Sequence, residues 1–227
     1  MNRVRNVIKL HMKNKMSWIW VPWMILGLNF VISFVIALSL NEDETMNTGG
    51  LFSVFIYMLV TGSVTLKDTF PFALGLSIRR KDYFLGTVAM ASLVSLFTSV
   101  LLTVVSLLED VTGGWGVRLH IFKVAFLSDF SPIVACGIYF IILLHMYFMG
   151  FAISSVHRRY GGAGLLIFFI AAALLTTTGA LLFSHFALWG LMFAWMAHHY
   201  LELFWWMVPV VAFYLAVSYG LLRRAAV

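Results

Sequence analysis

The most constraining feature of this sequence is a series of six long apolar runs, with the charged residues gathered between them. A helix needs about 20 mainly apolar residues to cross the hydrocarbon core of a bilayer. Only 11% of the residues are charged, compared with about 25% in a typical soluble domain. The pattern predicts an all-α integral membrane protein that forms a single transmembrane domain over residues 1–227. The six expected spans cover residues 17–40, 51–67, 83–108, 132–156, 163–183 and 204–222.

The distribution of charge predicts the orientation of these spans. Thirteen of the fifteen lysines and arginines lie before the first span, in residues 67–81, in residues 158–159 or at the C-terminus. Arg118 and Lys123 are the exceptions, and seven of the nine acidic residues share the opposite set of loops with them. Cytoplasmic loops of membrane proteins carry an excess of lysine and arginine. Both termini are therefore expected in the cytoplasm, and the net charge of +6 is interpreted as topology rather than as a nucleic-acid surface.

Two segments outside the spans have compositions of their own. In residues 1–16, Val4, Val7 and Ile8 recur at helical spacing while basic residues fill the other face, which predicts a helix lying at the membrane surface. A basic tail that only follows the charge rule is the alternative. Residues 184–203 are too aromatic for an ordinary loop and too interrupted for a span. They are expected to form a re-entrant or interfacial hairpin before the sixth span.

The chain offers little catalytic chemistry of its own. No aspartate or glutamate lies in the middle of an expected span, which argues against a carrier coupled to protons or sodium. Cys136 is the only cysteine, so one chain can form neither a disulfide nor a cysteine-based metal site. His145 lies within a span and is interpreted as a neutral packing residue. The sequence has no Gly-x-x-x-x-Gly-Lys-Ser/Thr phosphate loop, so any ATP used must be hydrolysed by another chain.

The segment between the second and third spans combines apolar and basic residues. Pro71 is expected to interrupt the continuation of the second span. Ser77 is predicted to be the N-cap of a helix that begins at Ile78. Four apolar side chains precede this cap and three cations follow it, namely Phe70, Phe72, Leu74 and Leu76, then Arg79, Arg80 and Lys81. This composition predicts a cytoplasmic coupling helix that contacts a partner or the membrane surface.

Residues 70–87 resemble the intracellular segment of small bacterial type-2 ABC exporter permeases. In that family a Leu-Ser/Pro-x-Ser/x-Arg-Arg/Lys-Asp/Glu-Tyr/Phe sequence leads into the third span, and the run from Leu76 to Tyr83 resembles it. The layout of the whole chain is also similar. It includes a basic interfacial helix, six spans, an Arg-Arg-x-Gly-Gly sequence from Arg158 to Gly162 and an interrupted apolar hairpin before the last span.

The resemblance implies the permease subunit of an ATP-driven exporter in the bacterial cell membrane, which moves a hydrophobic or amphipathic substrate. Its partners would be membrane lipids, a second permease (the same chain or a homologue) and two ATP-binding subunits. Those subunits would hold the ATP and magnesium, and this chain would be neither an enzyme nor a cofactor protein. The residues implied to couple it to the ATPase are Phe70, Pro71, Phe72, Leu74, Leu76, Ser77, Arg79, Arg80, Lys81, Asp82 and Tyr83.

Two other functions remain open at this stage. A non-catalytic immunity or sensor protein would bind a toxin or antibiotic through the outer aromatic hairpin and would need no ATPase. An intramembrane protease would use His145 to activate a serine on another span, and it would lose activity in a His145→Ala variant.

Overall fold

The chain folds into an elongated bundle of helices. The computed structural model describes residues 3–13, 16–40, 45–123 and 130–223. The helices are α1 (Arg3–Lys13), η1 (Met16–Trp20), α2 (Val21–Leu38), α3 (Phe52–Gly75), α4 (Arg80–Val111), η2 (Gly114–Arg118), α5 (Pro132–His185), α6 (Trp189–His198) and α7 (Tyr200–Arg223). Two short strands, β1 (Met46–Asn47) and β2 (Leu119–His120), pair in parallel. The all-helical prediction is confirmed, and α2, α4, α5 and α7 are long and apolar enough to cross a membrane.

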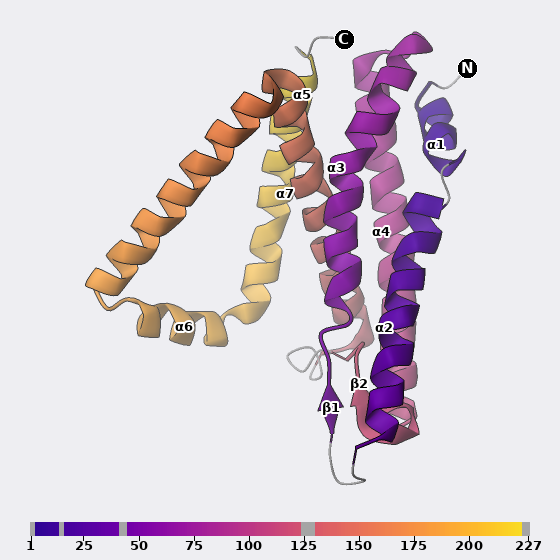
Figure 1. Ribbon diagram of the computed structural model, residues 1–227, viewed down its shortest axis with the longest axis vertical. Coiled ribbons are helices and arrows are strands. Elements are labelled where there is room, and N and C mark those ends of the chain that lie inside the picture. The colour runs from indigo at the N-terminus through magenta and orange to yellow at the C-terminus, as the bar shows by residue number, and fades with distance from the viewer. Residues whose placement is uncertain (1–2, 14–15, 41–44, 124–129, 224–227) are drawn as a thin grey trace.

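Helix α5 is one continuous helix except at Gly161, where φ is 69° and ψ is −168°. The sequence predicted a turn over residues 157–162, and the structure reduces it to a bend at one residue that tolerates positive φ. No residue of this fully described helix is buried after Ser155. The part of α5 beyond the bend diverges from the bundle and reaches α7 through α6 (Figure 1). Residues 162–198 are called the splayed arm below.

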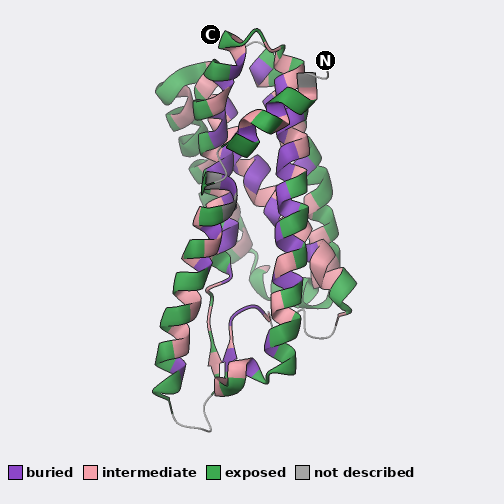
Figure 2. Cartoon of the chain, turned by 90° about the vertical axis from the view of Figure 1, so that its right-hand side faces the viewer, coloured by how far each residue is buried: buried purple, intermediate pink, exposed green. Residues whose placement is uncertain are grey.

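The core lies mainly between α3 and the first part of α5. An ideal Cβ at Gly62 of α3 would lie 2.0 Å from the Tyr147 carbonyl oxygen, and one at Gly150 of α5 would lie 2.0 Å from the Leu59 oxygen. The two backbones therefore touch, and glycine at both positions is what allows it. Buried residues follow the faces that the bundle helices turn toward one another, whereas much of the outer surface is exposed (Figure 2).

Helix α1 packs across α4 near the chain ends. Val7 and His11 are buried, and an ideal Cβ at Gly86 of α4 would lie 2.5 Å from the Val7 Cβ. Arg5 and Lys9 lie on the exposed face. The predicted amphipathic helix is thus present. However, the apolar face of α1 contacts protein, whereas the sequence pattern predicted that it would contact the membrane surface.

The connection between α3 and α4 differs from the prediction. Pro71 lies inside α3, which continues to Gly75, and the neighbouring Phe70 and Ala73 are fully buried and hold this last part of the helix in place. Ser77 does not cap α4. It follows the end of α3 with φ 56°, its N–H donates to the Leu74 oxygen, and the Ile78 N–H donates to the Ala73 oxygen. These two bonds form a Schellman motif.

The predicted coupling helix is therefore absent as a separate element. Helix α4 begins at Arg80, and the fully described residues 76–79 form a tight turn. Residues 184–203 also differ from the expected hairpin, because one short helix, α6, joins the ends of α5 and α7 (Figure 1). Several charged residues used to predict orientation lie outside the described residues, namely Lys15, Glu42, Asp43, Glu44, Asp129 and Arg224.

Candidate functional site

The predicted coupling residues lie at the end of the molecule that also holds α1 and both chain ends (Figure 1). The structure divides them by exposure. Pro71, Phe72, Leu76, Ser77, Arg79 and Lys81 are exposed, Leu74, Arg80 and Asp82 are half-buried, and Phe70 and Tyr83 are fully buried. The exposed set presents apolar and cationic side chains together. We call it the turn surface.

The two buried residues anchor the turn surface to the bundle. The Tyr83 hydroxyl lies 2.7 Å from the Thr69 hydroxyl, and the rings of Phe70 and Tyr83 meet edge to face at 5.1 Å. The Arg158 guanidinium of α5 lies 5.6 Å from the centre of the Phe70 ring, a cation–π distance. A partner docked on the turn surface would not touch Phe70 or Tyr83 in this conformation, so these residues would act through the residues around them.

Arg80 connects the start of α4 to the end of α7. Its Nη1 donates a hydrogen bond of 2.8 Å to the carbonyl oxygen of Arg223. The last carbonyls of a helix carry a partial negative charge that favours a nearby cation. A cation in the first turn of α4, which is unfavourable for α4 itself, is thus stabilising for α7.

Behind the turn, α1 contributes a buried histidine. The His11 Nε2 lies 3.0 Å from the Thr87 hydroxyl, and the His11 ring lies 5.4 Å from Trp18 and 6.1 Å from Tyr83. Burial lowers the pKa of the His11 imidazole to about 4, so the imidazole is neutral at physiological pH. The sequence pattern places His11 on the apolar face of α1 but does not reveal the contact with Tyr83.

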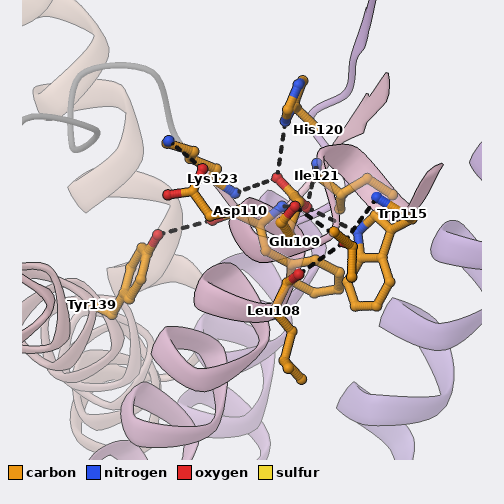
Figure 3. A network of polar contacts seen from close by, with 10 residues as sticks. Leu108, Glu109, Asp110, Trp115, His120, Ile121, Lys123 and Tyr139 are labelled. Atoms are coloured by element: carbon orange, nitrogen blue, oxygen red, sulfur yellow. Dashed lines mark hydrogen bonds and ion pairs between the residues drawn. The ribbon is translucent and has the colours of Figure 1, made fainter. Parts of the chain in front are cut away.

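A second polar cluster, which sequence reasoning missed, lies beside β2 at the opposite end of the bundle (Figure 1) and is drawn from close by in Figure 3. Glu109 of α4 is fully buried. One of its oxygens, Oε2, accepts hydrogen bonds from the Trp115 indole N–H at 3.2 Å and from the N–H groups of Ile121 and Phe122 at 3.0 and 2.9 Å. The other, Oε1, accepts the Lys123 N–H at 3.0 Å. The carboxylate therefore holds the loop after α4 in place.

The same loop is fixed on two further sides. The Tyr139 hydroxyl of α5 donates to the Phe122 oxygen at 2.9 Å, and the Thr48 N–H donates to the His120 oxygen at 2.9 Å beside the paired strands. The third expected span ended at residue 108, which left Glu109 in the loop after it. The available signal was the Gly113-Gly114-Trp115-Gly116 run, because positive φ at these residues turns the chain back over the end of α4.

No hydrogen bond joins His145 to a serine among the described residues. The His145 ring lies 5.4 Å from the ring of Tyr214, and the Ser155 hydroxyl donates to the Phe151 carbonyl at 2.8 Å. Within the described residues, no three histidine, cysteine or acidic side chains lie close enough to hold a metal ion. Comparisons with protein-family models, curated proteins and solved structures gave no match.

Proposed function

We propose that this protein is the permease subunit of an ATP-driven bacterial exporter, with six membrane spans and both termini in the cytoplasm. The observation that carries the proposal is the turn surface. Its apolar part, Pro71, Phe72 and Leu76, is exposed directly beside Arg79 and Lys81. An exposed apolar patch next to like charges is typical of a docking site for a partner with an acidic groove.

The lengths of the helices support six spans. At 1.5 Å per residue, the 54 residues of α5 extend over about 80 Å, whereas the hydrocarbon core of a bilayer is about 30 Å thick. The bend at Gly161 divides α5 into two spans that lead away from the same membrane face. Helix α3 has 24 residues, which extend over about 36 Å, and is counted as a span by its length. With α2, α4 and α7 this makes six, and α1 and the turn surface then share the cytoplasmic side.

The contacts behind the turn surface provide a route by which a docked ATPase could move the spans. Displacement of the turn would act on α1 through Tyr83 and His11, on α5 through Phe70 and Arg158, and on α7 through Arg80. Each link is a contact described above. ATP hydrolysed by the partner would in this way change the relative positions of the spans, and a hydrophobic or amphipathic substrate would pass along a cleft next to a second permease.

Co-purification tests this proposal. The full chain, expressed with the ATP-binding protein encoded beside it, is expected to retain that protein. The Phe72→Ser/Leu76→Ser and Arg79→Glu/Lys81→Glu variants should lose at least tenfold in ATPase retention, because each pair removes one component of the contact. These side chains are exposed, so the helical content measured by circular dichroism should not change.

The matched control is Lys9→Glu, which reverses an exposed cation on α1 at the same end of the molecule. It should retain the ATPase. The proposal is wrong if the wild-type chain retains no ATPase, or if both turn variants retain it at the level of Lys9→Glu.

A further inference from the structure

A hollow of about 420 Å³ lies between α5 and α7, beside the bend in α5. It is lined by Arg159 and Tyr160 of α5 and by Val217, Gly220, Leu221 and Arg223 of α7. Its volume falls within the range of about 300–1,000 Å³ that is usual for small-ligand sites. It does not belong to the turn surface, and the proposed function makes no use of it.

The charge of the hollow favours an anion. Arg159 and Arg223 come from different helices, and none of the six described residues that line the hollow is acidic. The Arg80 guanidinium donates to the Arg223 carbonyl at 2.8 Å. This bond also occupies a carbonyl oxygen that would otherwise repel an anion. Guanidinium groups match the oxygens of a phosphate in geometry and can bind them in pairs.

The walls of the hollow favour an anion that carries apolar chains. Val217 and Leu221 provide an apolar side, and the helices that form the hollow continue with exposed apolar residues such as Leu166 of α5 and Phe213 of α7. A phosphate group at the arginines would leave acyl chains free to lie along these surfaces. Basic pockets between membrane helices on the cytoplasmic side bind lipid headgroups in this manner.

We propose that the hollow between Arg159 and Arg223 binds the phosphate of an anionic phospholipid. The bound headgroup ties the bend of α5 to the last turn of α7, and so holds the base of the splayed arm. Inorganic phosphate carries at least as much negative charge as the lipid phosphodiester, but it cannot contact the apolar wall, which makes the lipid the better ligand.

Binding can be measured with the purified full chain in a neutral detergent. Short-chain phosphatidylglycerol is titrated while the thermal unfolding temperature is followed, with phosphatidylcholine and inorganic phosphate as separate arms. Phosphatidylglycerol should raise the unfolding temperature in a saturable manner, because a ligand that binds the folded state stabilises it. Phosphatidylcholine and inorganic phosphate should have little effect at the same concentrations.

Three variants locate the site. Arg159→Gln and Arg223→Gln should each weaken phosphatidylglycerol binding about tenfold, the usual effect of losing a charged hydrogen bond. Gly220→Leu should weaken it as well with both arginines retained, because a Cβ at Gly220 meets no described atom within 4 Å and a longer side chain would fill the hollow. Arg5→Gln, which removes an exposed cation of α1, should bind like the wild type.

The proposal is overturned by any of three results. The first is equal phosphatidylglycerol binding by the wild type, Gly220→Leu, Arg159→Gln and Arg223→Gln. The second is an equal loss in Arg5→Gln and Arg159→Gln, which would indicate diffuse charge attraction. The third is stabilisation by inorganic phosphate equal to that by phosphatidylglycerol, which would indicate a phosphate site without a lipid role.

Discussion

Replacing Glu109 with glutamine should destabilise the protein by about 4 kcal/mol. The glutamine oxygen can take the place of Oε2 and accept from Trp115, Ile121 and Phe122, but each bond then loses the charge of the acceptor, about 1 kcal/mol apiece. The amide NH₂ group would face the Lys123 N–H, which now donates to Oε1 at 3.0 Å. The Lys123 N–H is only part-buried, so leaving it unsatisfied costs near the lower end of the usual range of about 1–3 kcal/mol, which brings the total to about 4 kcal/mol.

The adjacent residue provides a matched control. Asp110 is also on α4, but its side chain is 51% exposed and its partner in the loop is the Lys123 ammonium group. An exposed ion pair contributes about 0–1 kcal/mol. The Asp110→Asn variant therefore makes the same chemical change one residue away, and its expected loss is below about 1 kcal/mol.

The assay is reversible unfolding in mixed detergent micelles, with the free energy of unfolding compared among the wild type, Glu109→Gln and Asp110→Asn. Limited proteolysis of the loop between α4 and α5 gives a local measurement, and Glu109→Gln should be cleaved faster there. If Glu109→Gln and Asp110→Asn unfold with the same free energy and are cleaved at the same rate, the carboxylate does not hold the loop and the reasoning is wrong.

Three further predictions concern the helix contacts. Lowering the pH to about 5 should weaken the docking of α1 by about 2 kcal/mol. Burial holds the pKa of His11 near 4, compared with an ordinary value of 6.5. The undocked state therefore binds more protons than the docked state as the pH falls below 6.5. Faster proteolysis of α1 would show the effect, and a His11→Gln variant should not respond to pH. Gly62→Ala or Gly150→Ala should cost about 3 kcal/mol of unfolding free energy through overpacking, whereas Gly137→Ala, whose Cβ would meet no described atom within 4 Å, should change little; equal losses in all three would contradict this. Gly161→Ala should cost about 1–3 kcal/mol, because φ 69° with ψ −168° suits only glycine, and an unchanged unfolding temperature would count against strain at the bend.

The apolar runs predicted the helices well because a long apolar sequence has few alternatives to a helix. The predicted spans at residues 83–108 and 132–156 lie entirely within α4 and α5. The helix ends were less predictable, because a helix can continue for a turn through polar residues after its apolar run has ended. The predicted third span ended at residue 108 for this reason, although Glu109 belongs to the last turn of α4.

The burial and contacts of the predicted coupling residues could not be derived from the sequence. Phe70 and Phe72 look equivalent in the sequence. On a helix, however, the side chains of residues two positions apart point about 200° away from each other. In the structure Phe70 is fully buried and Phe72 is 55% exposed. The sequence could not make this distinction because Pro71 pointed to a break in the helix there. The partners of Glu109 were also beyond reach, because they depend on the conformation of a glycine-rich loop.

The splayed arm has a thermodynamic consequence. None of residues 162–198, all of which the structure describes, is buried, and the arm joins the bundle through the single bend at Gly161 and through α7. Rotating it about that bend would disrupt few contacts within the chain. The free-energy differences among arm positions are then determined by what surrounds the arm, and a partner with unequal affinity for two positions selects between them. The same sequence can therefore hold different arm angles in different assemblies while its core remains unchanged.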